Sequence, residues 1–306
     1  AVRRIGLNTG FDAGSWGAEA VVNDLSEPEI FGGRFNFLHI FGLSAIADID
    51  PAGELESNEE RHLIGDPILV GTAFDIDIPI LNLQYLNLRA FADLGAIIPY
   101  TRYDLPGGPS AGFQYKTIYD SDRGSGLDAL QNYGFISGLM GKFLLLDYRL
   151  EFRHYRGAFK PTLFDSTYER NRVQYASEFA ALLYDDQLDS AYIVNGIYGE
   201  AGFNLFREKV IFTAGYLMPW SPDSEPSWSD LARQDYLMLR LAINKGLIPL
   251  YDISGSVSFE RNGFAYAVAK KKNLFTADAV LKGELVMPIA NTVDFAVVFT
   301  NAALGN

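Results

Sequence analysis

The sequence predicts an all-β protein: a transmembrane antiparallel up-and-down β-barrel of about 12 to 14 strands, formed by a single domain over residues 1–306. Three observations predict this fold. Apolar and polar residues alternate along most of the chain, the connections alternate between short and long, and the candidate strands run roughly 10 to 14 residues. Average soluble strands have about 5 or 6 residues, whereas a tilted membrane crossing needs about 9 to 11.

The stretch QYLNLRAFADLGAII, residues 84–98, shows the alternation. The residues at even positions from Leu86 to Ile98 are aliphatic, and those at odd positions include the charged Arg89 and Asp93. We call each such set of alternate residues a parity of the strand. Because successive side chains of a strand point to opposite faces, this strand has an aliphatic face and a charged face. A soluble sheet would turn the aliphatic face onto a core, and a membrane barrel would turn it onto lipid. We expect Leu86 through Ile98 to face lipid.

Other segments show the same two-faced pattern, with hardly any helical period between them. An even total of 12 or 14 strands is expected, because closed bacterial barrels usually have even numbers. The candidate strands include residues 2–11, 15–24, 33–49, 66–80, 86–98, 146–157, 235–244, 250–260 and 274–285.

The connections fall into two kinds. Long polar stretches begin near Asp50, Pro99, Arg156 and Pro219, with about 15 to more than 30 residues each. Short turns on one end of every hairpin and long loops on the other are typical of a polarised up-and-down meander. The short connections lie at residues 81–85, 143–146, 206–209, 245–249 and 287–291.

Composition excludes several classes of protein. No stretch supplies the roughly 20 uninterrupted apolar residues that a spanning helix needs. The absence of cysteine removes disulfides and thiolate metal sites. A net charge of −13 argues against a nucleic-acid partner, because such proteins concentrate Lys and Arg. Much of the acid lies in the long connections, at residues 52–60, 119–128 and 185–189, where it favours solubility.

Aromatic residues gather near both ends of the candidate strands. Tyr100 and Trp220 lie near long connections, whereas Phe143 and Tyr251 lie near short ones. Amphipathic rings at both strand ends match the two interfacial girdles of a membrane barrel.

With these strands, connections and girdles, the chain resembles the outer-membrane β-barrel proteins of diderm bacteria, over residues 66–300 and through weaker strands over residues 1–65. The resemblance implies an outer-membrane location, contact with outer-membrane lipid, insertion by the barrel assembly machinery, periplasmic short turns, extracellular long loops, and passive transport. Such chains commonly finish on a strand ending in an aromatic residue, whereas the last aromatic residue here is Phe299. Either the chain extends past Asn306 or its terminal signal is unusual.

Charged residues on the hydrophilic parity come from many separate strands. On a soluble sheet they would be ordinary solvent-facing charges. In a barrel they line the lumen, where opposed charges set ion selectivity or pair across a narrow interior and plug it. The set is Arg89, Asp93, Arg149, Glu151, Arg153, Glu200, Arg240, Lys282, Glu284 and Asp294. All except Glu200 and Asp294 are predicted to line a pathway for small hydrophilic solutes.

The three histidines form no catalytic or metal-binding constellation. His62 lies in a polar stretch, and His39 and His154 share the parity of apolar residues. No phosphate-loop, HExxH or EF-hand pattern is present. We expect no enzyme activity, no cofactor and no metal. An outer-membrane enzyme would need a Ser or Asp within hydrogen-bond reach of a histidine, and His154 beside Arg153 is the candidate.

The stretch 155–180 mixes aromatic and charged residues more densely than a solvated loop needs. It folds into the lumen as a constriction, lies over the surface as a partner site, or forms an external loop with its own aromatic cluster. The sequence thus predicts a porin-like channel for passive diffusion. One alternative is a plugged outer-membrane barrel that acts in structure, adhesion or complex assembly with other outer-membrane or surface proteins through its acidic loops. Another is a soluble all-β binding protein whose aliphatic faces meet in a core.

Overall fold

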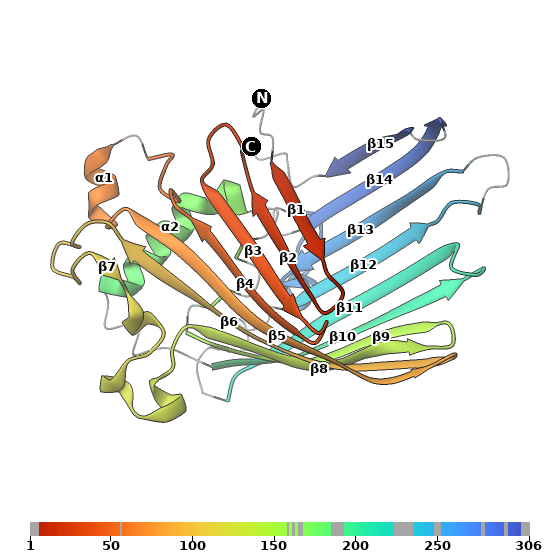
Figure 1. Cartoon of the computed structure of the whole chain (residues 1–306), viewed down its shortest axis with the longest axis horizontal. Helices are drawn as coiled ribbons and strands as arrows, with labels where there is room; N and C mark the ends of the chain where they lie inside the picture. The colour runs from red at the N-terminus through yellow and green to blue at the C-terminus, as the bar shows by residue number, and fades with distance from the viewer. Residues whose placement is uncertain are drawn as a thin grey trace. The chain divides into compact units, whose positions relative to one another are not determined.

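The computed structural model describes residues 6–55, 57–157, 159–160, 163–164, 168–184, 193–222, 235–247, 252–276, 279–290 and 293–300. Within this part the protein is all-β, with one sheet of fifteen strands and few helices (Figure 1). The strands are β1 (Leu7–Asp12), β2 (Trp16–Val22), β3 (Ile30–Phe37), β4 (Phe41–Asp48), β5 (Pro67–Leu83), β6 (Leu86–Thr101), β7 (Gly112–Phe113), β8 (Tyr133–Phe143), β9 (Leu146–Arg156), β10 (Ile193–Leu205), β11 (Val210–Trp220), β12 (Tyr236–Ile243), β13 (Ser254–Asn262), β14 (Ala279–Ala290) and β15 (Val293–Thr300).

The helices lie in the long connections. They are α1 (Asn58–Leu63), α2 (Tyr168–Tyr184) and α4 (Phe264–Ala269), with short 3-10 turns η1 (Tyr115–Thr117), η2 (Ser121–Arg123) and η3 (Gly126–Ala129). The 17-residue α2 lies in a stretch for which the sequence pattern predicts no helix. Its apolar residues repeat only weakly with the helical period, so periodicity alone does not reveal it.

Strand order confirms the up-and-down antiparallel arrangement. Each strand is hydrogen-bonded to its neighbours in chain order, except that the two-residue β7 pairs with β6 beside the main path. With β7 left aside, the sheet has fourteen described strands in sequence, the upper end of the predicted range.

The predicted alternation of connections is also present. Turns join β1 to β2, β3 to β4, β5 to β6, β8 to β9 and β10 to β11, whereas α1, α2 and α4 interrupt the connections at the other strand ends. The prediction of one strand over residues 33–49 is wrong, because the chain reverses between β3 and β4. Leu38 and His39 occupy this turn with φ of 56° and 52°. Positive φ at both central residues suits a tight hairpin, but neither residue is a usual turn former.

Several other predicted boundaries are displaced, and two of them illustrate the cause. The strand predicted to end at Ile80 continues to Leu83, so the turn before β6 is shorter than expected. The strand predicted from Leu274 begins at Ala279, because residues 274–276 form bends. At β5 the strand runs past the predicted end, and before β14 the apolar Leu274 and Phe275 lie outside the strand, so parity alone does not locate the boundary.

The chain divides into two compact units. Unit 1 comprises Ala1–Ile78, Phe91–Ile136 and His154–Ile193, and unit 2 comprises Pro79–Ala90, Ser137–Arg153 and Val194–Asn306. Each unit is described by itself below.

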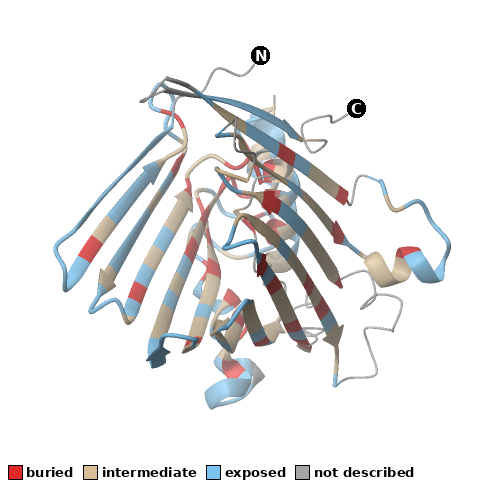
Figure 2. Ribbon diagram, turned by 90° about the vertical axis from the view of Figure 1, so that its right-hand side faces the viewer, coloured by how far each residue is buried: buried red, intermediate tan, exposed pale blue. Residues whose placement is uncertain are grey.

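The hydrophobic core of unit 1 lies between strands and α2. Ile30, Leu69 and Ile97 project from β3, β5 and β6, and they pack against Leu163, Tyr168 and Phe179. The core therefore lies on the parity of β6 that the sequence marks as charged. On that strand Ile97 is only 5% exposed and Phe91 8% exposed, whereas Leu94 on the aliphatic parity is 49% exposed. Figure 2 shows the resulting alternation of buried and exposed residues along the strands.

Candidate functional site

One face of the unit 2 sheet carries an apolar row that crosses six strands. Antiparallel register aligns residues directly across neighbouring strands on one face. The row runs Phe203, Phe212, Leu241, Val257, Gly283 and Phe299. All of its large members are exposed. Gly283 allows the Phe299 ring to lie over β14, because a Cβ at this glycine would collide with that ring.

The adjacent residues of the same strands form a polar row on the opposite face. It runs Gly202, Thr213, Arg240, Ser258, Lys282 and Thr300. Unit 1 repeats the pattern, with an apolar row of Phe11, Ala18, Phe35, Leu43 and Phe74 beside a polar row of Asp12, Gly17, Asn36, Gly42 and Asp75. Over the described residues, each unit thus has an exposed apolar row, with a polar row on the opposite face.

The polar face of unit 2 holds a charge triad on β9. The side chain of Glu151 is 0% exposed and lies between Arg149 and Arg153. Nε of Arg149 donates to Oε1 of Glu151, and Nε of Arg153 donates to Oε2 at 2.6 Å. These three predicted pore-lining residues are therefore brought together, and the buried carboxylate is neutralised by two guanidinium groups.

Two tyrosine–glutamate pairs extend this cluster. The guanidinium of Arg153 lies 4.5 Å from the ring centroid of Tyr198, whose hydroxyl donates to Glu200 at 2.7 Å. Tyr236 donates in the same way to Glu260 at 3.0 Å. We call Arg149, Glu151, Arg153, Tyr198, Glu200, Tyr236 and Glu260 the triad cluster. Tyr198, Tyr236 and Glu260 are not among the predicted site residues, although they lie on the hydrophilic parity of their strands.

Gly215 makes room for this arrangement. A Cβ at Gly215 would lie 2.3 Å from the hydroxyl oxygen of Tyr198, which is closer than any van der Waals contact. The glycine on β11 therefore allows the Tyr198 side chain to lie across the neighbouring strand.

The other predicted site residues are placed differently. Arg240 and Lys282 lie in the polar row, and Glu284 lies in register with Ser256 one step away. All three of these charged residues are exposed. Arg89 is exposed on β6, and Asp93 is half-buried further along that strand, in unit 1. The side chain of Asp294 lies outside the described residues.

In unit 1, α2 is anchored to the sheet by a buried ionic network. Arg172, whose side chain is 4% exposed, donates to both carboxylate oxygens of Asp48 at 2.7 and 2.8 Å. It also donates to Glu29 at 2.6 Å and to the carbonyl of Asp50 at 2.9 Å. The hydroxyl of Tyr168 donates to Asp48 at 2.7 Å. Each oxygen of a fully buried carboxylate is thereby satisfied.

The network shifts the titration of its members. Burial, followed by the charge of Asp48 and the hydrogen bond to it, raises the pKa of the Tyr168 hydroxyl. Burial acts against the charge of Arg172, but hydrogen bonds and ion pairs with Asp48 and Glu29 outweigh it and raise the pKa of the guanidinium. The arrangement therefore keeps Tyr168 neutral and Arg172 charged.

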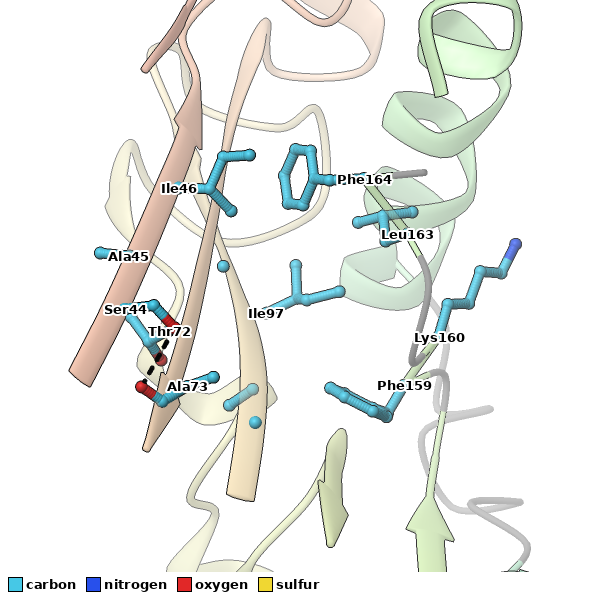
Figure 3. A pocket seen from close by; sticks show the side chains of 13 residues that line it. Ser44, Ala45, Ile46, Thr72, Ala73, Ile97, Phe159, Lys160, Leu163 and Phe164 are labelled. Carbon is cyan, nitrogen blue, oxygen red and sulfur yellow. Dashed lines mark hydrogen bonds between the residues drawn. The ribbon is translucent and has the colours of Figure 1, made fainter. Parts of the chain in front are cut away.

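An apolar cavity of about 380 Å³ lies beside this network (Figure 3). Phe159, Leu163 and Phe164 point toward Ile46 and Ile97 on the strands. The side chain of Lys160 points away from the cavity, where its ammonium pairs with Glu178 and lies 4.6 Å from the Tyr175 ring centroid. The predicted 155–180 loop is therefore in part a helix, packed on the strands of unit 1.

The histidines lie apart from one another. His39 occupies a turn rather than a strand, contrary to the prediction, and His62 lies 4.0 Å from Tyr103 between ring centroids. Nε2 of His154 is 3.3 Å from the hydroxyl of Tyr133. Over the described residues, His, Asp and Glu form no group of three that could hold a metal ion. No described helix is long and apolar enough to cross a bilayer.

No known protein family matches the chain, and no curated protein sequence matches it.

Proposed function

We propose that this chain is an outer-membrane β-barrel that allows passive, porin-like diffusion of small hydrophilic solutes. The observation that carries the proposal is the pair of neighbouring rows on the unit 2 sheet. The apolar row from Phe203 to Phe299 is exposed, and the row beside it carries Arg240 and Lys282 on the opposite face. Exposed apolar surfaces of this extent mark contact with lipid or a partner.

The strand order supports closure of the sheet. Over the described residues, β1 and β15 stand at the two ends of the strand order. Unpaired backbone groups cost several kcal/mol each in hydrocarbon, so a sheet in lipid must join its edges. Pairing of β15 with β1 would place the apolar rows on lipid and the polar rows around a lumen.

The triad cluster and the polar row would then line the pathway. Arg149, Arg153, Arg240 and Lys282 would supply positive charge and Glu284 negative charge, with Arg89 and Asp93 on β6. The predicted pore residue Glu151 is buried and would act by holding Arg149 and Arg153 in place. Rings of charge of this kind set ion preference in water-filled pores. No catalytic step is involved.

Planar-bilayer recording tests the channel. Purified, folded protein is expected to give discrete conductance steps in KCl. Arg149→Gln is expected to shift the reversal potential in a salt gradient toward cation preference, and Glu284→Gln toward anion preference. Glu284 is exposed, and in Arg149→Gln the buried Glu151 keeps its ion pair with Arg153, so both variants are expected to fold, which circular dichroism checks. Lys116→Gln, in the connection before β8 and paired with exposed Asp122, is the control and is expected to change neither. Folded protein without conductance steps would refute the channel.

The second candidate is a closed outer-membrane barrel with a structural, adhesion or assembly role. The observation that favours it is the cover that α2 forms over the strands of unit 1, anchored by Arg172 and Asp48. In that case the acidic connections would bind other outer-membrane or surface proteins. Detergent-dependent, folded protein that never conducts, and that is recovered from cells in a stoichiometric complex, would favour this second function.

A further inference from the structure

The polar row of unit 2 brings together two cations from strands far apart in the chain. Arg240 on β12 is in register with Ser258 on β13, and Ser258 is in register with Lys282 on β14. Thr213 and Thr300 continue the row on either side. Because strands lie about 4.8 Å apart, the two cationic residues begin about 10 Å from each other with a serine hydroxyl between them.

The two cations differ from three other cations of unit 2. Arg149, Arg153 and Lys142 in unit 2 each form an ion pair with a carboxylate. Arg240 and Lys282 form no ion pair with any residue that the structure describes, although acids outnumber bases 38 to 25 in the chain. Both are exposed, and two like charges on one row repel rather than stabilise the sheet.

The neighbouring acids do not neutralise the row. Glu284 follows Lys282 by two residues on the same face of β14, about 7 Å further along the strand. Glu260 lies one step to the other side and accepts a hydrogen bond from Tyr236. The row is therefore a band of positive charge and hydroxyls, bounded on each side by a carboxylate.

We propose that Arg240, Ser258 and Lys282 form a binding subsite for an oxyanion, such as the carboxylate or phosphate of a small solute. The guanidinium donates two parallel N–H groups, the ammonium supplies a mobile point charge, and the serine hydroxyl donates between them. Both long side chains reach an anion seated over Ser258. The inference rests on the proposed function for its role, as a resting place for anionic solutes on the pathway.

The test measures binding rather than conductance, so it is independent of the channel. Inorganic phosphate, and succinate as a carboxylate probe, are titrated into folded protein in neutral detergent at low ionic strength, with calorimetric detection. Arg240→Gln and Lys282→Gln are each expected to weaken binding about tenfold, the value of one charge-assisted hydrogen bond. Ser258→Ala is expected to weaken it a few-fold. Lys142→Gln removes the same charge from the paired Lys142–Glu208 site of unit 2 and is expected to have no effect.

The outcomes separate the subsite from the pore. Loss of binding confined to the row variants, with unchanged circular dichroism, supports the subsite, and preference between the two probes identifies the oxyanion class. Absence of binding to both probes, or equal weakening by Lys142→Gln, overturns it even if the protein conducts. If one of the row variants Arg240→Gln, Lys282→Gln or Ser258→Ala fails to fold, the other two decide by the same criteria. A protein that binds phosphate through this row but does not conduct retains the subsite and loses the porin function.

Discussion

The polar parity has different surroundings beneath α2 in unit 1 and on β12 and β14 of unit 2. On β3, β5 and β6 it carries Ile30, Leu69 and Ile97, which are buried beneath α2 and its preceding segment. On β12 and β14 it carries Arg240 and Lys282, which are exposed. The apolar parity is exposed in both units. Alternation in the sequence therefore shows which residues share a strand face. Whether that face is buried depends on what packs against it.

The largest effect is expected when the anchor of α2 is removed. Arg172→Ala leaves the fully buried carboxylate of Asp48 without its counter-charge, and we expect a loss of about 3–5 kcal/mol in the unfolding free energy. Guanidinium unfolding in detergent micelles measures it. The Asp48→Ala/Arg172→Ala double variant is expected to lose less than the sum of the single losses, because neither charge is then left unpaired. Additive losses would contradict a direct pairing.

A second prediction compares a charge on the apolar face with the same charge on the polar face, at adjacent residues of β13. Val257→Arg puts a charge in the apolar row, which the proposed lipid contact penalises by about 2–4 kcal/mol near the bilayer centre. Ser256→Arg puts the same charge on the polar face in register with Glu284, where we expect almost no loss. Unfolding in lipid vesicles measures both. Equal effects would show that the apolar row does not face lipid.

A third prediction concerns the pH dependence of the hydrogen bond between Tyr168 and Asp48. Tyr168→Phe removes the hydrogen bond to Asp48 and is expected to cost about 1.5–3 kcal/mol at pH 8. Burial first, and then Asp48, raise the pKa of Tyr168 in the folded state. Its contribution is therefore complete below the ordinary tyrosine pKa of about 10 and falls as the pH rises above it. The difference in unfolding free energy between wild type and Tyr168→Phe should narrow from pH 8 to pH 11. A constant difference would contradict the raised pKa.

The smallest effect is expected where a unit 1 ion pair lies outside the cover of α2. Arg34 pairs with Asp75 at 2.6 Å, but its side chain is 46% exposed. Arg34→Ala should therefore cost only about 0–1 kcal/mol, because water screens the pair. The same unfolding measurement applies, and a loss as large as that of Arg172→Ala would show that burial is not the decisive difference.

Much of the fold was predictable from local patterns. The alternation of apolar and polar residues predicts the strands that begin at Leu86, Leu146 and Tyr236, because a half-buried strand has a two-residue period. Long and short connections gave the up-and-down order. The turn at Leu38 and His39 was not predictable, because the usual glycine or asparagine signal is absent.

The site was predictable only in part. Arg149, Glu151 and Arg153 share one strand face, so their meeting follows from their spacing alone. The register that sets Arg240 beside Ser258 and Lys282 joins strands about twenty residues apart in the chain, and no local pattern specifies it.

Which residues lie on the same face of a strand follows from the sequence alone, because successive side chains point to opposite faces. The sequence also indicates the core of unit 1, because consecutive apolar residues make both strand faces apolar there. These residues are Ile68, Leu69 and Val70 on one strand and Ile97 and Ile98 on the next. That Arg172 reaches Asp48, 124 positions away, and that Arg240 and Lys282 align across β12 and β14, follows from the tertiary structure alone. Pairing between distant segments depends on the register of every intervening strand, and that is a property of the assembled sheet.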